Sequence, residues 1–222
     1  DCDHQQAPSK LIWATKAPVR NIPSFGLSGD VLYEPMWIST DYEPYRQIVM
    51  HVDPSGRGAD ETAIVITAYL NGYVYVLDLF GLDGGYDAGT LKKICKTAME
   101  YDCDMIMYES NFGDAMFGQL LIPVAQNMGC TSSIEEYRVS GAKEQRIINT
   151  LEPVMGSHRL VFDKRAIRSE ETQRQITRIT EVRGSLKHDD RVDALASAVA
   201  FWEDAMAMNV DAVLQQQADA AD

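Results

Sequence analysis

Hydrophobic and polar positions are patterned differently before and after about residue 46. Residues 1–45 are rich in proline, glycine and polar side chains and show little periodicity. This composition predicts a linker with short extended pieces at residues 10–14 and 31–38. From residue 47 the chain turns to β-branched and apolar runs, which predict three successive strands at residues 47–52, 62–70 and 73–80.

Strand and helix patterns alternate along the rest of the chain. Asn71-Gly72, between the second and third strands, is a strong signal for a two-residue hairpin turn. Short apolar runs predict further strands at residues 104–108, 134–139 and 159–162. Helical spacing predicts helices at residues 87–101, 114–128, 143–155, 170–180 and 190–208. A hairpin that leads into strand–helix units implies an α/β domain, with a mixed sheet covered by helices.

Composition fits one globular domain. Apolar residues make up 45 % and charged residues 24 % of the 222 residues, and no apolar run approaches the roughly 20 residues that span a bilayer. We therefore expect no membrane association.

The chain begins with Asp1 rather than Met, and several prolines follow, so we expect a fragment of a longer protein. We place the domain at residues 46–208 and a flexible tail at 209–222.

Cysteine spacing and net charge narrow the function classes. None of the four cysteines forms a CxxC pair, and no histidine lies at zinc-finger spacing from them, so we expect reduced thiols. A net charge of −13 argues against broad attraction to nucleic acid, but it leaves room for a local basic patch. Negative charge gathered at a metal site would be neutralised by bound cations.

Four acidic residues stand where sites form in open sheets. Asp53 ends the first strand, Glu109 ends the strand at 104–108, and Asp190 and Asp193 share one face at the start of the last helix. Four converging carboxylates would repel one another unless hard cations lay among them. Mg²⁺ or Mn²⁺ prefers such oxygen ligands, and two ions can clamp a phosphodiester during hydrolysis.

Each acid also has an ordinary interpretation. Asp53 can be a turn residue, Glu109 can open a loop, and Asp189 or Asp190 can cap the last helix. Asp193 alone is typical of a solvated helix face. Only their joint placement favours a site.

Three segments carry a family resemblance. They are residues 51–62 (HVDPSGRGADET), 108–114 (YESNFGD) and 187–196 (KHDDRVDALA). In this order they resemble the nuclease motifs of bacteriophage large terminase subunits, most closely those of short-tailed phages. The similarity extends from about residue 11 to residue 206.

The resemblance implies a ribonuclease H-like fold and a two-metal endonuclease that cuts concatemeric double-stranded DNA during genome packaging. By position, Asp53, Glu109 and Asp190 would bind two Mg²⁺ or Mn²⁺ ions, with Asp193 as an additional catalytic and metal-binding acid. His188 would orient a water or be structural. The family further implies an N-terminal ATPase domain in the same protein, portal and small-subunit partners, and the host bacterial cytoplasm. No GxxxxGK[ST] loop is present, so we expect no ATPase in this chain.

Basic residues near the third motif are candidates for DNA contacts. Lys143, Arg146, Lys187 and Arg191 would hold phosphates without reading bases. The alternative is a solvated surface balanced by nearby glutamates.

Three rival functions remain open. The first is another nuclease of this fold, such as a junction resolvase or transposase. The second is a sugar-kinase or actin-like phosphotransferase, although 222 residues leave little room for its second domain. The third is a noncatalytic assembly module that docks to the portal.

Overall fold

The fold was analysed in a computed structural model of the chain. The structure describes residues 2–13, 17–19, 22–27, 29–55, 61–110 and 116–207. The predicted tail, and parts of the first two motif segments, lie outside these residues.

A six-stranded mixed sheet forms the centre of the molecule, in the order β11-β10-β7-β8-β9-β12. Its strands are β7 (Ile48–Asp53), β8 (Thr62–Leu70), β9 (Tyr73–Leu82), β10 (Met105–Glu109), β11 (Ser133–Tyr137) and β12 (Leu160–Phe162). The first three are antiparallel neighbours, whereas β10 runs parallel to β7, β11 parallel to β10, and β12 parallel to β9. Asn71 and Gly72 both have positive φ, as the predicted hairpin turn requires.

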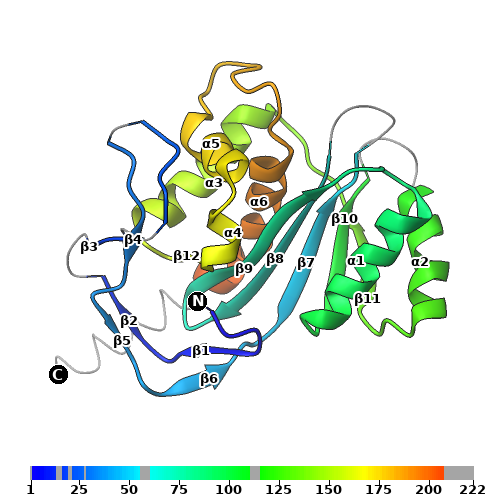
Figure 1. Ribbon diagram of the computed structural model, residues 1–222, viewed down its shortest axis with the longest axis horizontal. Helices are drawn as coiled ribbons and strands as arrows, with labels where there is room; N and C mark the ends of the chain where they lie inside the picture. Colours follow the sequence, from blue (N-terminus) through cyan, green and yellow to red (C-terminus); the bar gives the residue numbers. More distant parts are fainter. Residues whose placement is uncertain are drawn as a thin grey trace.

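Helices cover both faces of the sheet (Figure 1). They are α1 (Ala88–Glu100), α2 (Met116–Met128), α3 (Lys143–Gly156), α4 (Lys164–Ile167), α5 (Glu170–Arg178) and α6 (Asp190–Ala200). One buried cluster joins α1 and α2 to the face that carries Met50 and Ile66, and a second joins α3 and α6 to the face that carries Val49 and Val65. Successive strand residues thus point to opposite cores, which explains why these strands are apolar throughout.

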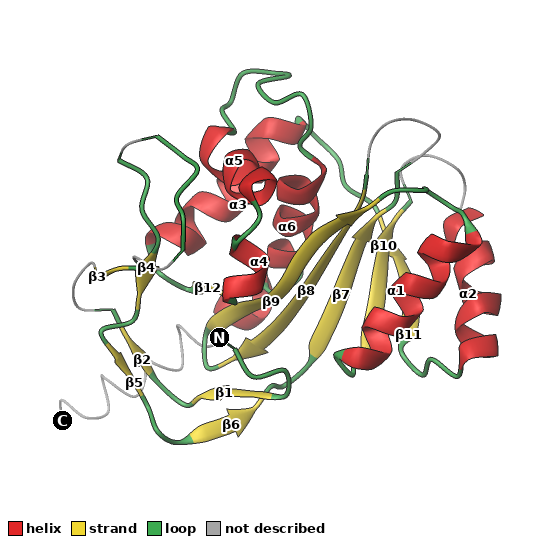
Figure 2. Cartoon of the chain, viewed as in Figure 1, coloured by secondary structure: helices red, strands yellow, loops and turns green. Residues whose placement is uncertain are grey.

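The N-terminal segment folds against this domain as three short antiparallel ribbons (Figure 2). The pairs are β1 (Gln6–Pro8) with β6 (Tyr42–Pro44), β2 (Leu11–Ile12) with β5 (Trp37–Ile38), and β3 (Ala17–Pro18) with β4 (Tyr33–Glu34). Ala7, Leu11 and Tyr45 belong to the core cluster under α1 and α2. The described part of residues 1–45 is therefore packed on the domain, and its role as a linker stays a prediction.

The predicted fold class is confirmed, with one correction at the last helix. We expected one helix over 190–208, but α6 ends at Ala200, the chain makes a turn at residues 201–202, and residues 203–207 are helical again. There the Trp202 indole donates to Thr67 Oγ1 at 3.0 Å and stacks on Tyr69. These contacts with the sheet lie at the point where the predicted helix is interrupted. The cysteines are free thiols, and no helix among the described residues is long and apolar enough to cross a membrane.

Candidate active site at the carboxyl ends of β7 and β10

Asp53 and Glu109 come together because their strands are parallel neighbours. In the β7–β10 register, His51 pairs with Met107 and Val52 pairs with Tyr108. Asp53 and Glu109 follow these pairs and end their strands at the same edge of the sheet. Both are half-buried, so their carboxylates share a region with restricted access to water.

Helix α6 adds its acids to this edge. It packs on β7 and β8, and its first turn carries Asp190 and Asp193. Asp193 is only 4 % exposed. Burial, followed by the negative charges of Glu109 and Asp193, raises the pKa of the Asp53 carboxyl well above its usual value. Burial and Asp193 also raise the pKa of Glu109, so these acids lie within electrostatic reach of one another.

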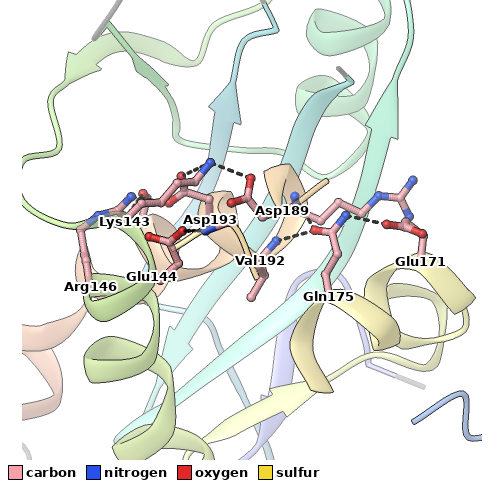
Figure 3. Close-up of polar contacts among 11 residues, drawn as sticks. Lys143, Glu144, Arg146, Glu171, Gln175, Asp189, Val192 and Asp193 are labelled. Atoms are coloured by element: carbon pink, nitrogen blue, oxygen red, sulfur yellow. Dashed lines mark hydrogen bonds and ion pairs between the residues drawn. The ribbon is translucent and has the colours of Figure 1, made fainter. Parts of the chain in front are cut away.

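Two basic side chains from the first turn of α3 reach the acids of α6 (Figure 3). Lys143 Nζ lies 2.7 Å from Asp189 Oδ1 and 3.1 Å from Asp193 Oδ2. Arg146 pairs with Asp193 Oδ1 and donates to Ser197 Oγ at 3.4 Å. Burial opposes the charge on Lys143, but Asp193 and Asp189 outweigh it and raise the pKa of the ammonium. The positive side chains of Lys143 and Arg146 offset part of the negative charge of these acids.

The donor types suit a hard divalent cation, because the site offers carboxylate oxygens. The repulsion that raises the pKa of Asp53 is what bound cations would relieve. Yet among the described residues, no three His, Cys, Asp or Glu side chains lie at a spacing that would hold a metal ion. The ion pairs of Asp193 with Lys143 and Arg146 account for part of this, since they engage both of its oxygens. The residues therefore fit a metal site by type and place, and their side chains must turn to bind it.

The remaining predicted residues differ in their surroundings. Lys187 is exposed and His188 half-buried in the loop before α6. Arg191 is directed inward, because each of its guanidinium nitrogens donates within the chain: two to Glu61 and one to Ser169 and Thr172. DNA contact by Arg191 stays a prediction that would require this network to open.

Sequence reasoning missed residues that border the site. Tyr137 ends β11 opposite Glu109, and burial followed by the charges of Asp53 and Glu109 raises the pKa of its hydroxyl. The rule that located the acids, a polar residue at the carboxyl end of a strand, missed it because we expected this strand to extend to residue 139, whereas β11 ends at Tyr137. Nothing in the local sequence points to Gln175, which contacts the start of α6 from α5.

Comparisons with known sequences agree with the motifs. Residues 52–160 match the family described as Terminase Bacteriophage T7, Ribonuclease H-like domain. The large terminase subunit of Enterobacteria phage T3 is 36 % identical over 224 residues, covering 93 % of this chain. The chain spans 38 % of the length of that relative.

Comparisons with solved structures show the same fold. The human cytomegalovirus terminase nuclease domain, in a Mn-soaked form, has a TM-score of 0.54 at 12 % identity, with 74 % of this chain and 86 % of that one covered. The nuclease domain of the large terminase subunit of bacterial virus Sf6 has a TM-score of 0.51 at 13 % identity, covering 70 % and 88 %. The large terminase of a thermophilic bacteriophage has a TM-score of 0.51 at 14 % identity, covering 71 % and 40 %.

Proposed function

Because residues 52–160 belong to the ribonuclease H-like domain family of phage terminases, we propose that this chain is a metal-dependent endonuclease that cuts concatemeric double-stranded DNA during viral genome packaging. The observation that carries the proposal is the convergence of Asp53 and Glu109 with the acidic first turn of α6. Structural neighbours that are terminase nuclease domains, one of them Mn-soaked, support it.

Asp53, Glu109, Asp190 and Asp193 would hold two Mg²⁺ or Mn²⁺ ions. Ions held there would supply an activated water and would stabilise the departing 3′ oxygen of the phosphodiester. The backbone that carries these acids is held in place because Asp53 and Glu109 end paired strands, and Asp190 and Asp193 begin a packed helix.

The basic residues of the chain would position the DNA backbone. Lys187 is exposed beside the site, and Lys143 and Arg146 already lie at the acids. With Asp193 bound to a metal ion, Lys143 would lose one of its two carboxylate partners, and its ammonium, still next to Asp189, would be close enough to turn to a phosphate oxygen. Contacts of this kind fix the position of the duplex without reading its sequence.

We further propose that the chain works within a longer large subunit, with an N-terminal ATPase domain, the portal protein and the small subunit in the host cytoplasm. The support is the T3 relative, of which this chain matches 38 %.

The test is a plasmid-cutting assay with Mg²⁺, with Mn²⁺ and with a chelator, next to an Asp53→Ala variant. If the parent chain nicks and linearises the plasmid only with metal, and the variant does not, the result supports the proposed nuclease activity. A four-way DNA junction, tested in parallel, distinguishes the proposed nuclease from a junction resolvase, because a resolvase would cut the junction in preference to duplex DNA. A folded chain that neither cuts DNA nor binds Mn²⁺ in calorimetry would favour the noncatalytic assembly module.

A further inference from the structure

Helix α6, which carries two of the four acids, has no capping hydrogen bond from the side chain of its own N-cap residue. Asp189 stands at the N-cap position of α6, but its side chain makes no capping hydrogen bond. Its Oδ1 accepts instead from Lys143 Nζ. The first N–H groups of a helix have no partner within the helix, so another acceptor is needed when they are buried.

Gln175, on the neighbouring helix α5, supplies that acceptor (Figure 3). Its Oε1 accepts from the backbone N–H of Arg191 at 3.0 Å and of Val192 at 3.1 Å. The side chain is buried, with 1 % exposure, and its Nε2 donates to Glu171 Oε1 at 3.0 Å. Two N–H donors on one side and a carboxylate on the other fix the orientation of the amide.

A cap supplied from outside the helix changes what the local acids can do. A carboxylate at the N-cap normally accepts from the second or third helical N–H and is then turned toward the helix axis. Because Gln175 takes two of these donors, Asp189 and Asp190 are not required for capping.

We propose that Gln175 is a positioning residue for the nuclease site: it fixes the first turn of α6 and thereby the backbone from which the carboxylates of Asp190 and Asp193 extend. This inference rests on the proposed function. Gln175 is not expected to touch metal or DNA.

The chain offers a matched control on the same helix. Gln173 is also buried, with 3 % exposure. Its amide donates to the carbonyls of Pro23 and Ile167, at 2.8 Å each, and accepts from the N–H of Phe25 at 3.1 Å. It therefore ties α5 to the N-terminal segment rather than to α6. Replacing either glutamine by methionine removes a buried amide with little change in side-chain volume.

The experiment compares Gln175→Met with Gln173→Met in three assays: urea unfolding, Mn²⁺ calorimetry and plasmid cutting. Both variants should lose stability. Only Gln175→Met should weaken Mn²⁺ binding, by about tenfold, as expected when a group that orients a metal ligand is lost. It should also lower kcat with little change in KM for DNA. Equal Mn²⁺ affinity in the two variants would overturn the inference.

A double variant that exchanges the amide and the carboxylate of residues 175 and 171 tests whether the lost Mn²⁺ affinity can be restored. Gln175→Glu combined with Glu171→Gln keeps an acceptor for both N–H groups, a donor to brace it, and the same net charge. The double variant should recover Mn²⁺ affinity to within about threefold of the parent chain, and recovery no better than that of Gln175→Met would count against the cap. A parent chain that itself binds no Mn²⁺ would overturn the proposed function as well. Binding by the parent that Gln175→Met leaves unchanged would overturn only the positioning role.

Discussion

At Asp53 the demands of folding and of the proposed chemistry oppose each other. Burial and the charges of Glu109 and Asp193 raise its pKa, so a charged Asp53 is costly while no cation is bound. Replacing it with the isosteric neutral amide, Asp53→Asn, should stabilise the metal-free chain by roughly 1–2 kcal/mol, as is common for active-site charges. Thermal unfolding in chelator measures this gain.

The same variant should lose the added stability that Mn²⁺ gives the parent chain, because binding to the folded state alone raises the unfolding temperature. Asp41→Asn, at an exposed position in the N-terminal segment, is the control and should change neither quantity. A less stable Asp53→Asn in chelator would contradict the repulsion described here.

Lys143 competes with cations for Asp193. Two unit charges about 4 Å apart interact by roughly 4 kcal/mol at an effective dielectric constant near 20, and solvent at the half-exposed ammonium reduces this. Lys143→Met should therefore tighten Mn²⁺ binding, by about tenfold, while it slows DNA cutting through the loss of a phosphate contact. Calorimetry and the plasmid assay measure the two effects separately. Weaker Mn²⁺ binding would show that Lys143 organises the acids instead of competing for them.

At the scale of residues, the sequence predicted which acids meet but not what surrounds them. Asp53 and Glu109 were located by one rule, that strand ends gather at one edge of a sheet. The inward orientation of Arg191 depends on Glu61, which lies 130 positions away in the chain. A pairing at that separation leaves no local pattern, so the sequence suggested a DNA contact.

At the scale of elements, a glycine in strand β9 leaves space for the side chain of Glu61, which pairs with Arg191 at the start of α6. A Cβ placed on Gly81 would lie 1.7 Å from Glu61 Oε2, the oxygen that accepts from Arg191 Nη2. Gly81→Ala should therefore displace the Glu61 carboxylate from Arg191 and destabilise the chain by about 1–3 kcal/mol, because hydrogen bonds between charged groups are lost. Urea unfolding measures the loss.

Gly156→Ala is the control for that substitution. Gly156 is the last residue of α3, and a Cβ there meets nothing within 4 Å. Alanine at this position should be neutral or slightly stabilising, since it restricts the unfolded chain. A comparable loss in both variants would mean that Gly81 is not specially constrained.

Elements with strong periodicity were predicted well, and those fixed by tertiary contact were not. The hairpin of β8 and β9 follows from Asn71-Gly72 and the flanking β-branched runs. The predicted helix is interrupted at residues 201–202, where Trp202 contacts Thr67, and a contact between residues this far apart in the chain leaves no periodicity in the sequence. The ribbons of the N-terminal segment pair residues that are well separated in the chain, as Ala7 is from Glu43, and so look like irregular chain in the sequence.

For the whole molecule, Asp163 ties the N-terminus to the domain. This buried carboxylate accepts from the N–H of Cys2 at 2.6 Å and from the backbone and side chain of Arg165. Burial alone would raise its pKa, but the hydrogen bonds from Arg165 and Cys2 outweigh burial and hold the pKa below its usual value. Asp163→Asn should cost roughly 2–4 kcal/mol at neutral pH, because it leaves buried donors without their charged acceptor.

The pH dependence of this contribution follows from the lowered pKa. The unfolded chain protonates the aspartate first, so the stabilisation is complete above about pH 4 and is lost as the pH falls through the lower pKa of the folded state. Urea unfolding near pH 7 and near pH 3 should therefore show a smaller difference between parent and Asp163→Asn in acid. A constant difference would mean that the ionised carboxylate is not the source of the stability.

The order of the acids along the chain has a consequence for synthesis on the ribosome. Asp53 and Glu109 lie on strands that are made early, whereas Asp190 and Asp193 lie on α6, which is made later. Domains fold as units while translation proceeds from the N-terminus, so an incomplete nascent chain lacks half of its proposed metal ligands. The proposed metal site would therefore be incomplete until α6 has been synthesised.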